Sequence, residues 1–412
     1  MSNEIYEGLI EIKSYYSQGT LPDLFRFDDG RRVSTADEWN ERRAEIYKTA
    51  IELQYGTIPP APDSFKVEPL YICRTGLPSG YRITCCRGEK SLSFTMYLFK
   101  AEDSEGAPVT VSGDLCFPYV FDKEYVSTFI NNGISLAIFN RTELAPDIAG
   151  YNISGLDKDG NEYIEGKKVL DQVTEIDCGG PLKELYPEYS FGAIGAWAWG
   201  YSRCVDALIY LGNVDANTIA FTGHSRGGKV AALAGALDER AAIVNPNASC
   251  SGGYGSYRIH IEATKEDGSV ARSEPLKNIH INFPSWLGKE MREYIGREDE
   301  LPFDSHHLKA MVAPRVLFVS EAASDIMANP VGTWQTSLAA GEVYKFLGCE
   351  ENLIWYFRRG VHRHAIEDIE QLVNVIRHVK YGEALNDKYF KLPFTPTDLS
   401  FDWRAPKKEK DG

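Results

Sequence analysis

Short apolar runs alternate with turn residues and amphipathic stretches along most of the chain, and this pattern predicts its elements. A helix opened by Thr35 and extending to residue 53 is followed by runs of β-branched and aromatic residues typical of strands. These strands are predicted at 67–73, 81–86, 92–100 and 109–116. Strands and helices then take turns: strands at 134–139, 218–222, 241–244, 316–320 and 353–357, and helices at 123–131, 193–211, 231–237, 343–347 and 367–378. Such alternation predicts an α/β fold with a mostly parallel sheet covered by helices on both faces.

The same pattern divides the chain into three parts. We predict an N-terminal helical extension over 1–66, one large α/β domain over 67–405 and a charged tail over 406–412. Two stretches, about 140–190 and 249–307, are too long for simple connections between neighbouring elements. Long excursions of this kind are usually lids or binding loops, so we expect them to shape a pocket.

Composition and charge exclude several classes of protein. With 43% hydrophobic and 12% aromatic residues in 412, the chain can bury a large core. Its net charge of −15 argues against sequence-independent binding to nucleic acid or to an anionic membrane. No apolar run approaches the roughly 18 residues of a membrane helix. Residues 1–16 lack a signal-peptide core and the eight cysteines form no CxxC, so we expect a cytoplasmic protein with reduced thiols.

The segment around Ser225 carries the clearest chemical signal. The predicted strand 218–222 leads into Gly223-x-Ser225-x-Gly227, which is followed by a predicted helix. This is the pattern of a nucleophile elbow, in which glycines on either side let the chain turn sharply and raise the serine hydroxyl above the sheet. The turn directs the N–H of Arg226 and the helix N-terminus toward a developing oxyanion.

Two other interpretations of this segment remain open. Gly223, Gly228 and Lys229 satisfy most of a phosphate-binding loop, but Val230 stands where Mg²⁺ coordination requires serine or threonine. That loop also normally follows the first strand of its fold, whereas several strands precede this one. The segment could also be a purely structural turn.

An elbow of this type requires an acid and then a histidine later in the chain, at strand ends. Glu321 and Asp325 follow one predicted strand, and His362 and His364 follow the next. We predict Asp325 as the acid and His362 as the base that takes the proton from Ser225. Three alternatives remain: Glu321 could be the acid, Asp325 could instead cap the following helix, and His364 could be the base.

Several ordered motifs from about residue 109 onward resemble carbohydrate esterase family 15, which comprises glucuronoyl esterases and related sequences called acetyl xylan esterases. Beside the elbow Gly-His-Ser-Arg-Gly-Gly-Lys, these motifs are Asn140-Arg-Thr-Glu143, Ala145-Pro-Asp147, Trp197-Ala-Trp199-Gly200, Phe283-Pro-Ser-Trp286, Leu301-Pro-Phe-Asp-Ser-His306, Ala313-Pro-Arg315, Arg359-Gly-Val-His362 and Glu367-Asp368.

The resemblance implies an α/β-hydrolase fold and hydrolysis of an ester between a sugar acid and an alcohol, in that family the glucuronate branches of xylan and lignin alcohols. By position it implies Ser225 as nucleophile and Arg226 at the oxyanion hole. It also implies that Lys229 and Trp286 contact the sugar and that His362 is the base.

The sequence departs from the family pattern at the acid. Members with a Glu-Ser-Gly motif take the acid from that glutamate, but here residues 247–253 read Asn-Ala-Ser-Cys-Ser-Gly-Gly, with Ala248 at its position. Alanine cannot orient a histidine, so Asp325 is the expected supplier. The expected cytoplasmic location also implies that the enzyme acts on imported fragments or on another ester.

We therefore expect serine-dependent hydrolysis of a carbohydrate carboxylic ester, with a glucuronoyl ester of xylan-derived oligosaccharides as the leading substrate. No cofactor is expected, and the sequence contains no HExxH motif that would indicate a catalytic metal. The alternatives are an acetyl (xylan) esterase acting on acetylated sugars and a carbohydrate-binding relative without catalytic activity.

Overall fold

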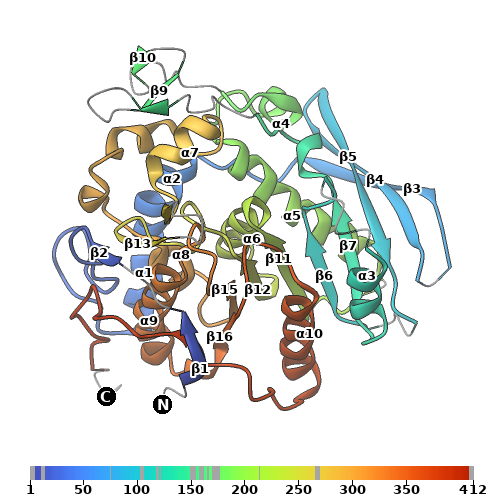
Figure 1. The fold of residues 1–412 in the computed structure, drawn as a ribbon. Helices are drawn as coiled ribbons and strands as arrows, with labels where there is room; N and C mark the ends of the chain where they lie inside the picture. Colours follow the sequence, from blue (N-terminus) through green and yellow to red (C-terminus); the bar gives the residue numbers. More distant parts are fainter. Residues whose placement is uncertain are drawn as a thin grey trace.

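A nine-stranded sheet runs through the centre of the molecule (Figure 1). The structure, a computed structural model, describes residues 5–10, 14–74, 76–102, 106–116, 120, 122–148, 155–156, 162–164, 167–168, 177–212, 214–264 and 270–407. In order across the sheet, the strands are β16 (Leu353–Arg358), β15 (Val316–Ala322), β12 (Ala241–Asn247), β11 (Ile219–His224), β6 (Val109–Ser112), β7 (Ser135–Phe139), β5 (Lys90–Phe99), β4 (Pro78–Arg87) and β3 (Ser64–Tyr71).

The type of strand pairing changes once across this sheet, from parallel to antiparallel. Every pairing from β16 to β7 is parallel, whereas β5, β4 and β3 form an antiparallel edge. The prediction of a mostly parallel sheet is therefore confirmed. Because parallel strands end on the same side, the segments that follow β11, β12, β15 and β16 meet at one edge.

Helices cover both faces of the sheet, as the strand pattern predicts. From α3 onward, the α-helices of the described residues are α3 (Lys123–Ile130), α4 (Gly180–Leu185), α5 (Ala193–Leu211), α6 (Arg226–Leu237), α7 (Leu276–Asn282), α8 (Ser305–Ala310), α9 (Pro330–Leu347) and α10 (Ile366–Tyr381). Phe221 and Val319 point into the core under α5 and α6, and their neighbours Ala220 and Phe318 point into the core under α3 and α10. Within the described part of the chain, no helix is long and apolar enough to cross a membrane.

The N-terminal part contains strands as well as the predicted helix. Thr35 caps α1 (Ala36–Ile46), which continues through a π-helical turn (Tyr47–Glu52) into α2 (Leu53–Tyr55). The expectation of helix and loop alone missed the two earlier strands. These are β1 (Ile5–Ile10), which pairs with β17 (Leu392–Phe394), and β2 (Ser14–Ser17), which forms a small sheet with β13 (Ile259–Thr264) and β14 (Val270–Arg272).

The first predicted excursion, about 140–190, lies partly outside the described residues, as does most of the predicted tail over 406–412. Its described pieces include the short strands β8 (Gly155–Leu156), β9 (Glu162–Ile164) and β10 (Lys167–Lys168).

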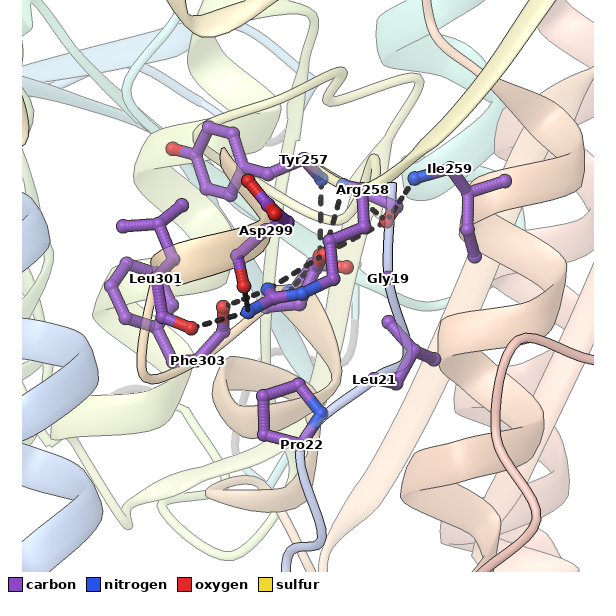
Figure 2. A network of polar contacts seen from close by, with 12 residues as sticks. Gly19, Leu21, Pro22, Tyr257, Arg258, Ile259, Asp299, Leu301 and Phe303 are labelled. Carbon is purple, nitrogen blue, oxygen red and sulfur yellow. Dashed lines mark hydrogen bonds and ion pairs between the residues drawn. The ribbon is translucent and has the colours of Figure 1, made fainter. Parts of the chain in front are cut away.

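The second predicted excursion, about 249–307, is held by a buried network of polar contacts around Arg258 (Figure 2). Its guanidinium is 2% exposed and donates to the carbonyl oxygens of Phe303 (2.6 Å), Asp299 (3.2 Å) and Leu301. The carbonyl of Arg258 accepts from the N–H of Gln18 at 2.9 Å, which ties the N-terminal segment to the same network. Such pairing satisfies polar groups that burial would otherwise leave unpaired, so these described residues of the excursion are tied into the fold.

A buried lysine lies between α8 and α9. The ammonium of Lys309 donates to the carbonyl of Thr333 (2.7 Å) and to the hydroxyls of Thr336 (2.7 Å) and Ser337 (2.9 Å). The side chain is fully buried, and this burial lowers the pKa of Lys309 from 10.5 to about 7.

We expect this lysine to give the protein a stability that rises with pH. Between pH about 7 and 10.5 the unfolded chain keeps the Lys309 proton and the folded chain releases it, so unfolding takes up a proton. The contribution of Lys309 to the free energy of unfolding should increase across this window by up to about 1.4 kcal/mol per pH unit. Urea melts at several pH values should show that Lys309→Met removes this slope. The control Lys345→Met, on the exposed side of α9, should keep it, and an unchanged slope in Lys309→Met would contradict the assignment.

Candidate active site

Ser225 occupies the sharp turn that the sequence predicts between β11 and α6. Its backbone has φ 56° and ψ −117°, a left-handed conformation that non-glycine residues rarely adopt outside functional turns. A side chain at Gly223 would meet the carbonyl oxygen of Gly227 at 2.3 Å, so this glycine is required for the close approach. Helix α6 begins at Arg226, and its N-terminal N–H groups therefore lie next to the serine hydroxyl.

A buried ion pair between Asp114 and Arg141 packs against the turn that carries Ser225. Asp114 is fully buried, accepts from the N–H of His224 at 3.0 Å and forms an ion pair with Arg141, which is also fully buried. A side chain at Gly227 would meet an oxygen of Asp114 at 2.0 Å, so the carboxylate fills the space under the turn. No motif in the sequence indicates Asp114, because it lies far from Ser225 along the chain.

Three side chains from three different strand ends form a continuous hydrogen-bonded chain. The Nε2 atom of His362 lies 2.8 Å from the Oγ atom of Ser225. Its Nδ1 atom lies 2.5 Å from Oδ2 of Asp325, which is 3% exposed. These are the contacts that a serine nucleophile, its base and an orienting carboxylate need. The structure thus brings together the three residues that the sequence singled out.

The two alternative candidates lie elsewhere. Glu321 is 1% exposed, and its Oε1 atom accepts from the hydroxyl of Thr333 at 3.2 Å rather than from an imidazole. Burial raises the pKa of Glu321 well above its usual range, which favours the neutral carboxyl over the carboxylate that would stabilise an imidazolium. His364 packs its ring against Tyr125 and against His224, with ring centroids 5.7 Å and 5.4 Å away. Burial lowers the pKa of His364 well below its usual range.

His224 is a neighbour of the base that sequence reasoning missed. Its ring centroid lies 4.7 Å from that of His362, and its Nδ1 atom lies 2.7 Å from Oδ1 of Asn247. Burial lowers the pKa of His224 to about 4, so this imidazole is neutral near pH 7 and presents no positive charge to His362. The elbow motif contains His224, but no spacing rule in the sequence places it against the base.

On the other side of Ser225, a carboxylate links the predicted oxyanion residue to the predicted sugar residue. Asp147 accepts from the guanidinium of Arg226 at 2.6 Å and from the indole N–H of Trp286 at 3.0 Å. The guanidinium also lies over the Trp286 ring, 5.2 Å from its centroid. Trp286 is 2% exposed and stacks on Phe283 at 3.8 Å, so the half-buried Phe283 forms the outer face of this aromatic pair.

Lys229 lies one turn along α6 from the serine, but its ammonium is already occupied. It donates to the carbonyl of Ser249 at 3.0 Å, to the carbonyl of Ser251, and to a carboxylate oxygen of Glu274 at 2.7 Å. These contacts account for all three of its N–H groups, and the side chain is 2% exposed. Lys229 can therefore affect ligand binding only indirectly, by holding the carboxylate of Glu274 in place. The sequence did not identify Glu274.

Ala248 follows β12 beside the strand that carries Asp325. Its N–H donates to the carbonyl of Ser320 in β15 at 3.1 Å, so the two strand ends are direct neighbours. The alanine has a positive φ of 43°, is 1% exposed, and packs with Cys250 and Ala328. Residue 248 therefore lies at a strand end from which a carboxylate could approach the catalytic histidine. Here the residue is an alanine, and its methyl group packs among apolar side chains.

The arrangement is suited to acyl transfer at an activated serine next to a helix N-terminus. In the described ranges, no group of three or more His, Cys, Asp or Glu side chains could hold a metal ion.

Comparisons with known proteins point to one group of enzymes. The family described as "Glucuronyl esterase, fungi" matches residues 167–348. The 4-O-methyl-glucuronoyl methylesterase of Hypocrea jecorina is 27% identical over 399 residues, which cover 95% of this chain and 76% of that protein. The enzyme of the same name from Schizophyllum commune is 29% identical over 348 residues, covering 82% and 76%. Among solved structures, a carbohydrate esterase family 15 glucuronoyl esterase from Caldicellulosiruptor kristjansonii matches with a TM-score of 0.77 and 28% identity, covering 95% of this chain and 98% of that one.

Proposed function

We propose that this chain is a member of carbohydrate esterase family 15, and that it is a serine esterase that hydrolyses glucuronoyl esters of xylan-derived or related oligosaccharides. The observation that carries the proposal is the hydrogen-bonded chain from Ser225 through His362 to Asp325, with distances of 2.8 and 2.5 Å. The names of the relatives support the glucuronoyl part of the substrate.

The first half of the reaction forms an acyl-enzyme. His362 Nε2 takes the proton of the Ser225 hydroxyl as its Oγ atom attacks the ester carbonyl, while Asp325 holds the Nδ1–H and stabilises the imidazolium. The negative charge that develops on the carbonyl oxygen is stabilised by N–H groups at the start of α6, that of Arg226 first. The imidazolium then returns the proton to the departing alcohol, and the acid remains bound to the serine.

The second half releases the sugar acid. A water molecule gives its proton to His362 and attacks the same carbonyl carbon, and the proton then returns to Ser225 as the acid leaves. We assign sugar binding to two pairs of side chains, which together form the sugar wall. One pair is Trp286 with Phe283, and the other is Lys229 with Glu274. The first pair contacts Arg226 and the second contains Lys229, and both of these residues belong to α6, which begins directly after Ser225.

The test of this proposal compares two substrates at matched concentrations. The methyl ester of glucuronate, free or on a xylo-oligosaccharide, should be hydrolysed with a much higher kcat/KM than an acetylated xylo-oligosaccharide. A preference for the acetylated sugar would assign the chain to the acetyl esterases instead. Failure to hydrolyse either ester, together with no labelling of Ser225 by a fluorophosphonate probe, would indicate a carbohydrate-binding protein.

Lys229 offers a separate prediction about sugar binding. Lys229→Met should raise KM for a glucuronate ester about tenfold, because Glu274 loses the charged hydrogen bond that orients it. KM for p-nitrophenyl acetate, which has no sugar, should change little. Initial-rate kinetics on both substrates check this, with Lys380→Met on the remote end of α10 as the control. Equal rises in KM for the two substrates would remove the sugar-binding role.

A further inference from the structure

The loop that carries His362 has little packing on its outer side. It leaves β16 after Arg358 and reaches α10 at Ile366. Val361 is 63% exposed, and the side chain of His362 is 28% exposed. A hollow of about 550 Å³ separates the loop from the start of α3, where Glu124 lies. Among the described residues, neighbouring side chains therefore do not fix the position of this loop on that side.

A buried guanidinium holds the loop from within. Arg358 is 6% exposed, and its terminal nitrogens donate to the carbonyl oxygens of Arg359 (3.1 Å), Val361 (3.3 Å) and Arg363 (2.5 Å). The three acceptors surround His362 in the sequence, so one side chain fixes the loop before and after the base. The planar fork of arginine can make these contacts together, whereas a lysine ammonium cannot match their geometry.

The guanidinium is anchored in turn to α10. The Nε atom of Arg358 lies 3.0 and 2.9 Å from the two carboxylate oxygens of Asp368, which is 1% exposed. Asp368 also accepts from the N–H of Ala365 at 2.9 Å, so the end of the loop is held by the same carboxylate. A helix with a fixed place against the sheet thus determines where the loop lies.

The backbone of the loop is shaped around this side chain. Gly360 has φ 121°, and a side chain there would meet a terminal nitrogen of Arg358 at 2.6 Å. The carbonyls of Arg358 and Gly360 accept from the N–H groups of Ala323 (2.9 Å) and Ser324 (3.1 Å). The loop carrying the base and the loop carrying Asp325 are therefore joined into one unit.

We propose that Arg358, anchored by Asp368, is a positioning residue that sets the place of His362 relative to Ser225 and Asp325. The inference rests on the proposed function, because it concerns the base of that reaction. Arg358 does not touch the reacting atoms. It acts through the carbonyls on either side of His362, and a misplacement of about 1 Å at a reacting group can cost about 100-fold in rate.

The first experiment replaces the guanidinium of Arg358 with an ammonium and so keeps the positive charge. Arg358→Lys should lower kcat on a glucuronate ester about 10- to 100-fold and leave KM within about threefold, because the sugar wall is elsewhere. The rate at which a fluorophosphonate probe labels Ser225 should fall by a similar factor. This labelling needs the serine and its base but no particular substrate, so it reports on His362 separately from substrate identity.

The second experiment uses the hollow beside the loop as an entry path. In Arg358→Ala, added guanidinium chloride, below the concentration that begins to unfold the protein, should restore labelling of Ser225 in a saturable way. Sodium chloride at equal concentration should not. A side chain needed only for overall stability would gain nothing from guanidinium, which is a denaturant. Should Arg358→Ala fail to fold, Arg358→Lys alone decides.

A matched control is available elsewhere in the molecule. Arg315 also spreads its guanidinium over backbone carbonyls, those of Gly235, Asp238, Ala241 and Met311. Arg315→Lys should lose thermal stability without losing kcat or the labelling rate.

Two results would overturn the positioning role: normal labelling in Arg358→Lys, or equal losses in the Arg358 and Arg315 variants. An absence of labelling in the wild-type protein would instead remove the proposed function, and this inference with it.

Discussion

Ser225→Ala is expected to lower turnover of a glucuronate ester by several orders of magnitude, about 10⁶-fold by comparison with a well-studied serine triad. The hydroxyl is the only group in the hydrogen-bonded chain that can form the acyl-enzyme, so without it neither half of the reaction proceeds through the serine. Initial rates measured at high enzyme concentration, together with fluorophosphonate labelling, check this expectation.

Folding should survive this substitution, because the alanine keeps the Cβ atom and the backbone N–H that donates to the Asn247 carbonyl at 3.0 Å. The melting temperature of Ser225→Ala should therefore lie close to that of the wild type. Retention of even a tenth of the wild-type activity in a folded variant would refute the assignment of the nucleophile.

Asp325→Asn should reduce kcat by up to about 10⁴-fold with little change in KM. The carboxylate accepts from His362 Nδ1 at 2.5 Å, and an amide at this position can neither stabilise the imidazolium nor guarantee the correct tautomer. The measurement is a comparison of kcat and KM in the variant and the wild type. Glu321→Gln is the control, and it should keep most of kcat because Glu321 binds Thr333 instead of the imidazole.

A second substitution in the same background tests whether the acid can change strands. Ala248 follows β12, which pairs with β15, so Ala248→Glu should restore part of the activity of Asp325→Asn. Restoration should be incomplete because the position is packed against Cys250 and Ala328 and has a positive φ. Near-normal kcat in the single Asp325→Asn variant would instead mean that another carboxylate holds the histidine.

The sequence predicted the central parts of the site because they depend on local chain geometry and on strand order. The elbow at Ser225 needs only a strand, two glycines and a helix. In a parallel sheet, the acid and the base must come from later strand ends on the same edge. The choice between Asp325 and Glu321 depended on which of two buried carboxyls faces the imidazole of His362, and the sequence does not contain that information.

The predictions that were wrong or incomplete concern segments whose structure depends on polar contacts between residues far apart in the sequence. Helix α9 was predicted only over 343–347, although it begins at Pro330. Its first turns carry buried polar residues that bind Lys309, and these residues weaken the apolar period. The contact of Lys229 with the sugar, which the family resemblance implies, stays a prediction. The actual partners of Lys229, among them Glu274, come from a later excursion that local pattern cannot place.

The strands missed near the N-terminus have the same origin. Strands β1 and β2 do not pair with strands close to them in the sequence. Their partners, β17 and β13, lie far along the chain. Short runs such as Ser14–Ser17 become strands only because a matching edge is available in the folded molecule.

The pairing of Ile5 with Leu392 has a consequence for the order in which the protein is made. A ribosome adds about 5–20 residues per second, so the first described strand waits on the order of tens of seconds before its partner exists. During that time β1 cannot be part of any finished structure, while the elbow and the strands around it can already assemble. Strands β1 and β17 therefore pair only after the elbow and the strands around it have been made.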